Sequence, residues 1–183
     1  MVSGVGRHAV PIASFEHALR DAGVEPYNLV SVSSILPPDA TFVEPHEGVE
    51  RLSPGQVVHA VLGRDTTDEG RATAAVGVAR TDEGHGYFVE RSGSWRGAEG
   101  DVRDHAEPAE TDDVDGKEDD TAVGDSAETL AREMVETSDS TGEVVDSFNV
   151  EASASAHEDD DKHVTVVAAA VLVPPEGITV LSS

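Results

Sequence analysis

The spacing of apolar and polar residues predicts a chain in which helices alternate with groups of strands. Apolar side chains recur with helical spacing over residues 13–22, where Ser14 would cap the helix and a glycine follows the last turn. A second helix is predicted over residues 126–137, with Asp125 and Glu128 at its start like the two members of a capping box. Both helices are amphipathic, so we expect each to cover an apolar surface with one face.

Short apolar runs indicate β-strands. Strands are expected at residues 28–33, 55–62, 72–79, 86–91, 148–156 and 163–173. The first of them is expected to be buried, and the last, which contains "VTVVAAAVLV", to be central and covered on both faces. The acidic "HEDDDK" before the last strand predicts the tip of a hairpin. The order of elements predicts one α+β domain over residues 1–183, with helices covering β-sheets.

A long acidic segment, residues 99–125, interrupts this pattern. Ten of the twenty positions from Asp101 to Asp120 are Asp or Glu, with a proline and a glycine among them. Such a composition cannot bury enough apolar surface to offset the entropy of ordering the chain. We therefore expect a solvated, mobile loop.

The charge balance narrows the possible partners. The chain has 12 Lys and Arg against 37 Asp and Glu, a formal net charge of −25. This surface repels nucleic acid and anionic membranes, and it suits a cationic small molecule or a salt-adapted, halophilic setting. A disordered acidic protein is the alternative, which the long Val- and Ala-rich runs oppose.

Several classes of site and of location are excluded or disfavoured. The absence of cysteine rules out disulfides and thiolate chemistry. No apolar run approaches the about 20 residues of a membrane span, and the N-terminus lacks the apolar stretch of a secretion signal. The expectation is a cytoplasmic protein without a membrane partner. Two acidic segments, 157–163 and 112–120, invite a metal, but the first is an ordinary solvated turn and the second lacks a calcium-loop pattern, so no metal is expected.

Two adjacent serines, Ser33 and Ser34, stand between an apolar strand and "ILPP". A serine hydroxyl can attack the preceding carbonyl carbon and convert the amide into an ester, if the backbone is strained and the oxyanion is stabilised. Elimination then breaks the chain and turns the second serine into a pyruvoyl group. Its ketone condenses with amines and accepts electrons from a carbon that loses CO2. The dipeptide alone is common, and two turn hydroxyls at a strand end remain the other interpretation.

The flanking residues strengthen the chemical interpretation. The segment "NLVSVSSILPP", residues 28–38, resembles the processing site of the pyruvoyl-dependent arginine decarboxylases. Other segments resemble the helices and strands of that family: "FEHALRDAGV", "GRATAAVGVA", "GYFVE", "AETLAREM" and "VTVVAAAVLV". Two departures are the expanded acidic segment and a glutamate, Glu16, at a first-helix position where aspartate is expected.

The resemblance implies a role for each matching residue. Cleavage would give a β chain, Met1–Ser33, and an α chain that opens with the pyruvoyl group derived from Ser34. Asn28 would assist processing, Glu90 would be the proton donor, and Glu16 would pair with the substrate guanidinium. Each of these side chains also has a plainer interpretation. Glu90 would be an ordinary glutamate at a strand end, Glu16 a solvent-facing residue of a helix, and Asn28 an asparagine that forms a local hydrogen bond in a turn.

The resemblance also implies an activity and an architecture. The expected reaction converts L-arginine to agmatine and CO2 for polyamine synthesis, with the pyruvoyl group as cofactor and neither metal nor pyridoxal phosphate. The expected fold is an αββα sandwich that forms homotrimers with active sites between subunits. Two alternatives stay open: decarboxylation of another amino acid such as histidine, and an uncleaved, non-catalytic binding or regulatory paralogue. The joint presence of Asn28, Ser33, Ser34 and Glu90 argues against the second.

Overall fold

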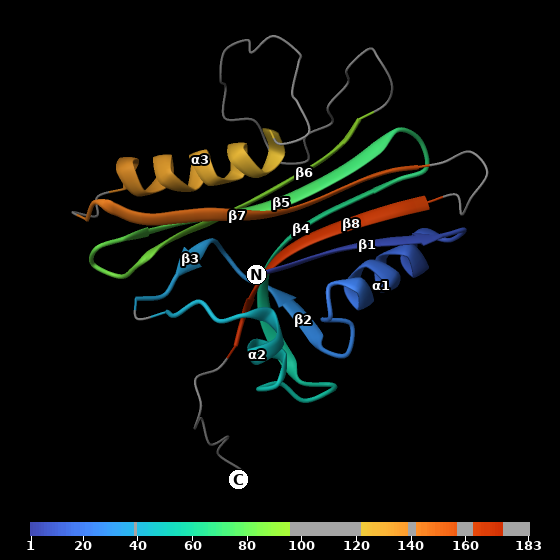
Figure 1. Ribbon diagram of the computed structural model, residues 1–183, viewed down its shortest axis with the longest axis horizontal. Helices are drawn as coiled ribbons and strands as arrows, with labels where there is room; N and C mark the ends of the chain where they lie inside the picture. Colours follow the sequence, from blue (N-terminus) through green and yellow to red (C-terminus); the bar gives the residue numbers. More distant parts are fainter. Residues whose placement is uncertain (39, 96–121, 139–141, 157–162, 174–183) are drawn as a thin grey trace.

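Two four-stranded sheets, each covered by a helix, form the described part of the chain (Figure 1). The computed structural model describes residues 1–38, 40–95, 122–138, 142–156 and 163–173. Sheet A has the order β1 (Val2–His8), β8 (His163–Leu172), β4 (Val57–Thr67) and β2 (Asn28–Ser31). Sheet B has the order β3 (Ile35–Leu36), β6 (Gly86–Trp95), β5 (Arg71–Thr81) and β7 (Val144–Ser155).

The helices lie on the outer faces of the two sheets. Helix α1 (Pro11–Asp21) packs on β1 and β8 of sheet A, and α3 (Ala122–Thr137) packs on β5, β6 and β7 of sheet B. A short helix, α2 (Pro45–Val49), precedes β4. Figure 1 shows the resulting order of layers, α3, sheet B, sheet A and α1. The predicted α+β fold class, with helices covering sheets, is confirmed. None of the helices in the described ranges is long and apolar enough to cross a membrane.

Apolar side chains from both sheets form the core between them. The largest side chains of this core are Leu36, Val61, Val76, Phe88 and Val166, all at most 1% exposed. Strand β8 is buried along most of its length and lies between β1 and β4, so the prediction of a central strand is confirmed.

Small residues let the helices approach the sheets closely. A Cβ atom at Gly6 of β1 would meet the backbone of Ser14 and Ala18 in α1, and one at Gly77 of β5 would meet the backbone of Ala127 in α3. Strand β1 was not predicted, because its glycines carry no apolar signal although they face the helix.

The start of α1 differs from the prediction. The helix begins at Pro11, its N-cap is Val10, and no side chain caps it. Ser14 is fully buried inside the helix, where its Oγ donates to the Pro11 carbonyl at 2.8 Å and bonds Thr165 Oγ1 at 2.7 Å. The predicted Ser14 cap is therefore wrong, because proline already starts the first turn and the hydroxyl is needed to satisfy a buried threonine.

Helix α3 also begins earlier than predicted, at Ala122. Asp125 lies within its first turn, so the predicted capping box is wrong. Glu128 instead accepts hydrogen bonds from Ser147 Oγ at 2.8 Å and Asn149 Nδ2 at 3.0 Å on β7. The last residues of the predicted acidic loop, 122–125, are helical, and 99–121 lie outside the described residues.

Two predictions about strands are corrected by the topology. The strands on either side of residues 157–162 do not form a hairpin, because β7 pairs with β5 whereas β8 pairs with β1 and β4. The tip itself lies outside the described residues. Strand β2 is an edge strand with Val30 43% exposed, and not the buried strand expected. The other predicted strands are present, most of them longer than expected.

Candidate active site around Ser33 and Ser34

The two serines lie where the chain crosses from one sheet to the other. Strand β2 of sheet A ends just before them, and β3 of sheet B begins just after them. On one side, the Val32 amide donates to the Ala60 carbonyl at 3.1 Å. On the other, the Phe88 amide donates to the Ser34 carbonyl at 2.7 Å. The Ser33–Ser34 peptide bond is thus held from both sides by different sheets.

A tight turn is centred on Ser34. The Ile35 amide donates to the Ser33 carbonyl oxygen at 3.0 Å, which closes a three-residue turn. This oxygen is the atom on which negative charge develops when the Ser34 hydroxyl attacks the Ser33 carbonyl carbon. A backbone donor is therefore already in place to stabilise that charge.

The strand register brings Ser34 and Glu90 to the same face of sheet B. Ile35 pairs with Tyr87, so one further step places Ser34 opposite Phe88, in agreement with their hydrogen bond. Glu90 is the diagonal neighbour along β6, a separation of about 7–8 Å between α-carbons in an antiparallel pair. Side chains alternate along strands, so Ser34, Phe88 and Glu90 share one face. Phe88 is buried there, Ser34 is half-buried, and Glu90 is exposed in the single chain.

Asn28 lies at the far end of β2. Its Nδ2 donates to the Gly55 carbonyl at 2.7 Å, and its backbone amide donates to the Gln56 carbonyl at 2.8 Å. Roughly 15 Å of extended chain separates it from Ser33. Within one chain, Asn28 therefore fixes β2 against the start of β4 and does not reach the peptide bond between the serines.

Glu16 lies on the outer surface of α1, away from the serines. Its side chain is exposed, and α1 covers the face of sheet A opposite to sheet B. Arg20, one helical turn later, has its pKa raised mainly by its hydrogen bond to Glu25, with a smaller contribution from Glu16. Figure 1 shows α1 well apart from β3. In the single chain, Glu90 is therefore the diagonal neighbour of Ser34 across β6, whereas Asn28 and Glu16 lie elsewhere.

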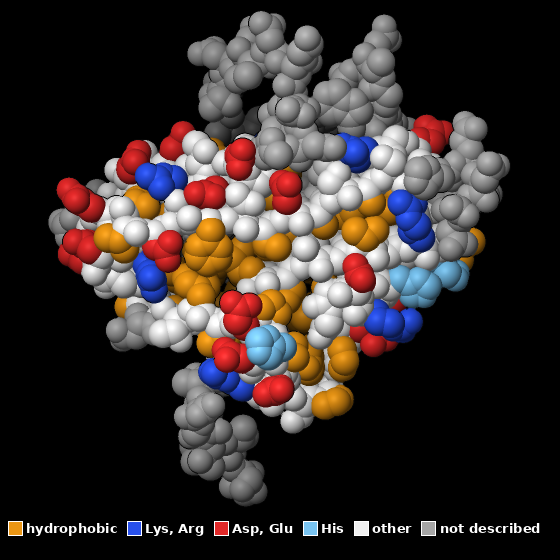
Figure 2. All heavy atoms as spheres, in the orientation of Figure 1, with side chains coloured by type: hydrophobic (Ala, Val, Ile, Leu, Met, Phe, Trp, Pro, Cys, Tyr) orange, Lys and Arg blue, Asp and Glu red, His pale blue; other side chains and the backbone are white. Residues whose placement is uncertain are grey.

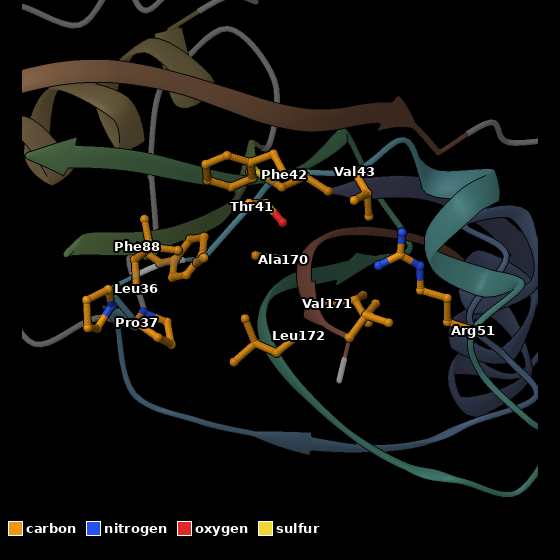
Figure 3. A pocket seen from close by; sticks show the side chains of 14 residues that line it. Leu36, Pro37, Thr41, Phe42, Val43, Arg51, Phe88, Ala170, Val171 and Leu172 are labelled. Atoms are coloured by element: carbon orange, nitrogen blue, oxygen red, sulfur yellow. The ribbon is translucent and has the colours of Figure 1, made fainter. Parts of the chain in front are cut away.

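A pocket of about 740 Å³ lies directly downstream of the serines (Figure 3). It is bounded by the segment after β3, by the end of β8, and by Arg51, two residues after the end of α2. Its lining residues are Met1, Leu36, Pro37, Pro38, Ala40, Thr41, Phe42, Val43, Arg51, Phe88, Ala170, Val171, Leu172 and Val173. Figure 2 shows hydrophobic side chains gathered in a hollow on this face.

The ionisable groups in this pocket are basic. Arg51 lines it, and burial lowers the pKa of the Met1 amino group, with Glu44 opposing that effect. No Asp or Glu of the described residues is among its lining. In the same part of the chain, no group of three or more His, Cys, Asp or Glu side chains is placed to hold a metal ion. The described residues of one chain therefore offer apolar surface beside Ser34, but no carboxylate for a guanidinium in this pocket.

The residue pattern did not reveal the two backbone amides that hold the serine pair. The N–H groups of Ile35 and Phe88 point at the Ser33 and Ser34 carbonyls because of the turn and the strand register. Every residue except proline carries such a donor, so no residue type marks it. The short length of the segment between β2 and β3 is the only feature of the sequence that suggests these donors.

Comparison with known proteins shows the family of this chain. The family described as pyruvoyl-dependent arginine decarboxylase (PvlArgDC) matches residues 1–177. Pyruvoyl-dependent arginine decarboxylase 2 of Archaeoglobus fulgidus is 52% identical over 103 residues, which cover 54% of this chain and 66% of that relative. Pyruvoyl-dependent arginine decarboxylase 1 of Methanosarcina acetivorans is 37% identical over 176 residues, covering 93% and 92%. A probable pyruvoyl-dependent arginine decarboxylase of Chlorobaculum tepidum is 37% identical over 185 residues, covering 93% of each chain. The chain therefore belongs to the pyruvoyl-dependent arginine decarboxylase family, and its enzyme class is that of a decarboxylase.

Proposed function

We propose that the chain cleaves itself between Ser33 and Ser34 and then converts L-arginine to agmatine and CO2, a step that feeds polyamine synthesis. The observation that carries the proposal is the placement of the serine pair. Its peptide bond lies at the crossing between the sheets, with the Ile35 amide 3.0 Å from the carbonyl oxygen that is attacked. The cofactor is the pyruvoyl group derived from Ser34, with neither metal nor pyridoxal phosphate.

The cleavage balances without an added reagent other than water. Ser34 Oγ attacks the Ser33 carbonyl carbon, the C–N bond breaks, and the hydroxyl proton ends on the Ser34 nitrogen. Loss of the Ser34 α-proton then expels the carboxylate of Ser33 and leaves a carbon–carbon double bond at residue 34. Water adds, ammonia leaves, and a ketone remains. The Ile35 amide stabilises the charged oxygen in the first step.

The surrounding residues fit the new group. The Phe88 amide holds the carbonyl of residue 34 and so keeps the chain end against β6. The pyruvoyl group supplies a ketone that binds the substrate amine and takes up the electrons released with CO2. Glu90, on the same face, gives a proton to the carbon that has lost CO2.

We further propose that the site is completed in a homotrimer. Three apolar side chains on the neighbouring strands β2, β3 and β4 are exposed in one chain: Val30 at 43%, Ile35 at 53% and Val57 at 59%. Among the described residues, none that line the pocket beside Ser34 is a carboxylate, whereas Glu16 is exposed on α1. A neighbouring copy covering the apolar patch supplies the missing carboxylate and desolvates Glu90. The net charge of −25 supports a cytoplasm rich in salt as the setting.

The proposed function can be tested by measuring the masses of the chain fragments and the release of CO2 from amino acids. The purified chain, incubated in concentrated salt, should separate into a fragment ending at Ser33 and a larger one that carries pyruvoyl in place of Ser34. The cleaved protein should release CO2 from arginine in preference to histidine, ornithine and lysine. A chain that stays intact after prolonged incubation refutes the proposal that it is a self-cleaving enzyme. Release of CO2 from histidine alone would make histidine, and not arginine, the substrate.

The trimer is tested by a charge in the apolar patch. We expect the native mass by light scattering to be about three times the 19.1 kDa of one chain. Val57→Asp should yield monomers, because a buried unpaired carboxylate is costly. Val145→Asp is the matched control, since Val145 is equally exposed at 58% but lies on the opposite edge strand β7. An unchanged mass for Val57→Asp would remove this patch from the interface.

A further inference from the structure

Arg80 occupies a position where the strand pattern calls for an apolar side chain. It lies on β5 in alternation with Val76 and Val78, which are both buried in the core between the sheets. Its side chain therefore starts on the inner face of sheet B, with only 30% of its surface exposed. A half-buried cation at the end of a core strand is a local conflict of the kind that accompanies function.

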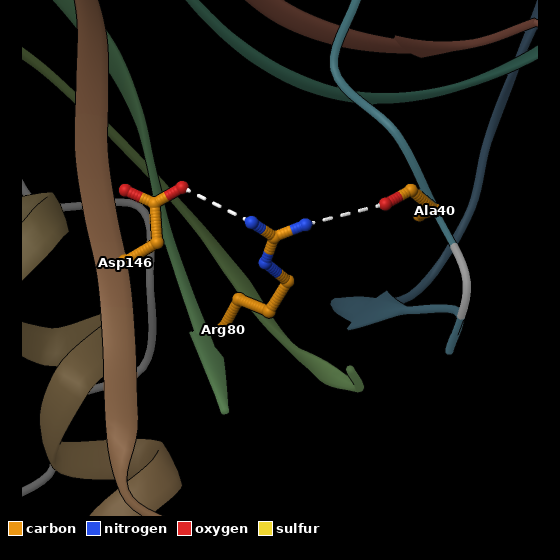
Figure 4. A network of polar contacts seen from close by, with 3 residues as sticks. All are labelled: Ala40, Arg80 and Asp146. Atoms are coloured by element: carbon orange, nitrogen blue, oxygen red, sulfur yellow. Dashed lines mark hydrogen bonds and ion pairs between the residues drawn. The ribbon is translucent and has the colours of Figure 1, made fainter. Parts of the chain in front are cut away.

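The guanidinium joins two segments that are distant in sequence (Figure 4). Arg80 Nη1 donates to the Ala40 carbonyl at 3.4 Å, and Nη2 lies 3.4 Å from Asp146 Oδ2 on β7. Its Cζ is 5.7 Å from the centre of the Phe42 ring, which in turn packs edge-on against Phe148 at 4.7 Å. Each contact alone is weak, but those with Ala40 and Phe42 both act on segment 40–43, while the ion pair with Asp146 fixes the guanidinium to β7.

Segment 40–43 is a wall of the pocket beside Ser34. All four of its residues line that pocket, opposite Leu36 and Phe88 (Figure 3). The Ala40 amide also donates to the Pro37 carbonyl at 3.3 Å, which ties the segment to the end of β3. A shift of this wall therefore moves the end of β3, the strand that follows the cleavage point.

The strand register places Arg80 directly in line with that strand. Across sheet B, Leu36 pairs with Gly86, Gly86 pairs with Arg80, and Arg80 pairs with Asp146. Glycine is required in this row, because a Cβ at Gly86 would meet the Ala79 carbonyl. Arg80 thus contacts the pocket wall directly and lies in the same row of sheet B as Leu36 at the end of β3, with Gly86 between them.

We propose that Arg80 is a positioning residue that anchors segment 40–43 and thereby holds residue 34 in place after cleavage. The inference rests on the proposed cleavage for its catalytic part. Strand β3 has only two residues, so once the chain is cut, few hydrogen bonds hold the new end against β6. In addition to these few hydrogen bonds, the contacts of Arg80 with segment 40–43 hold the new chain end in place. A misplacement of about 1 Å at a reacting group can cost about a hundredfold in rate.

The first test uses the uncleaved Ser34→Ala chain and does not depend on activity. Arg80→Met in this background should speed hydrogen exchange of the Ala40 amide, which donates to the Pro37 carbonyl, about tenfold, the factor expected for loss of one charge-assisted hydrogen bond. Exchange along β5 and β7 should stay unchanged. Arg132→Met is the matched control, since Arg132 donates to Ser147 Oγ on β7 at 2.8 Å, away from the pocket.

The second test uses the cleaved enzyme. Arg80→Met should reach full cleavage, with kcat about tenfold lower and KM changed by less than about threefold. Arg80→Lys should recover part of kcat, because it keeps the charge but not the two-ended guanidinium. Should Arg80→Met fail to fold, Asp146→Asn and Phe42→Leu should each give the same pattern more weakly.

Two outcomes overturn the inference. One is unchanged exchange of the Ala40 amide, and the other is exchange that rises equally along β5 and β7, which would make Arg80 only a general support of sheet B. A wild-type chain that never cleaves refutes the proposed function, while the exchange test still decides the role of Arg80.

Discussion

Ser34→Ala should remain a single chain of 19.1 kDa under conditions in which the parent protein is fully cleaved. The alanine side chain has no oxygen to attack the Ser33 carbonyl, so the ester cannot form and no pyruvoyl group arises. Decarboxylation should be lost with it. Intact mass spectrometry after prolonged incubation measures the first effect, and CO2 release from arginine measures the second.

Ser33→Ala is the matched control for this substitution. Ser33 contributes only its backbone carbonyl, which the Ile35 amide contacts whatever the side chain is. Cleavage should therefore continue, within about tenfold of the parent rate if no more than one hydrogen bond is disturbed. Cleavage of Ser34→Ala, or loss of cleavage only in Ser33→Ala, would contradict the assignment of the nucleophile.

The location of the serine pair would let the domain stay folded after the proposed cleavage. The residues before the cut remain paired with β4 through the Val32 amide, and the carbonyl after the cut remains bonded to Phe88. Each new end thus stays attached to a different sheet. The core between the sheets, which provides most of the stabilisation, is not interrupted.

Elements whose own apolar residues indicate that they are buried could be predicted from the sequence. Strand β8 is the clearest case, because its unbroken apolar run matches burial on both faces. Helix starts were misplaced where tertiary contacts decided them: Ser14 bonds Thr165 across to β8, and Glu128 bonds Ser147 on β7. Strand β1 was missed because its glycines contribute space for α1 and no hydrophobicity.

The candidate site likewise contains some features that the sequence reveals and others that depend on the folded backbone. The serine pair and Glu90 carry recognisable side chains at a recognisable spacing, and the register places Ser34 and Glu90 on one face. The amides of Ile35 and Phe88 left no trace in the sequence, since their role depends on where the backbone turns. Arg80 is visible in the sequence as a charge at an inward position of an apolar strand. Its significance becomes clear only from the pairing of the strands.

Glu90→Gln should separate cleavage from turnover. Glutamine has nearly the shape of glutamate but no proton to give to the carbon that loses CO2. Cleavage at Ser34 should run to completion, whereas kcat for arginine should fall about a hundredfold, at the lower end of what general acids contribute. Single-turnover release of product at saturating arginine measures this step directly.

Glu136→Gln is the control for the change in charge, because Glu136 is exposed on α3 and lies on the outer face of sheet B. Its kcat should stay within about twofold of the parent value, as expected of surface substitutions away from the site. If Glu90→Gln turns over arginine as fast as this control, the proton must come from another group. If it also fails to cleave, Glu90 acts earlier, on the serine pair itself, and its place two residues beyond Phe88 would serve processing instead of turnover.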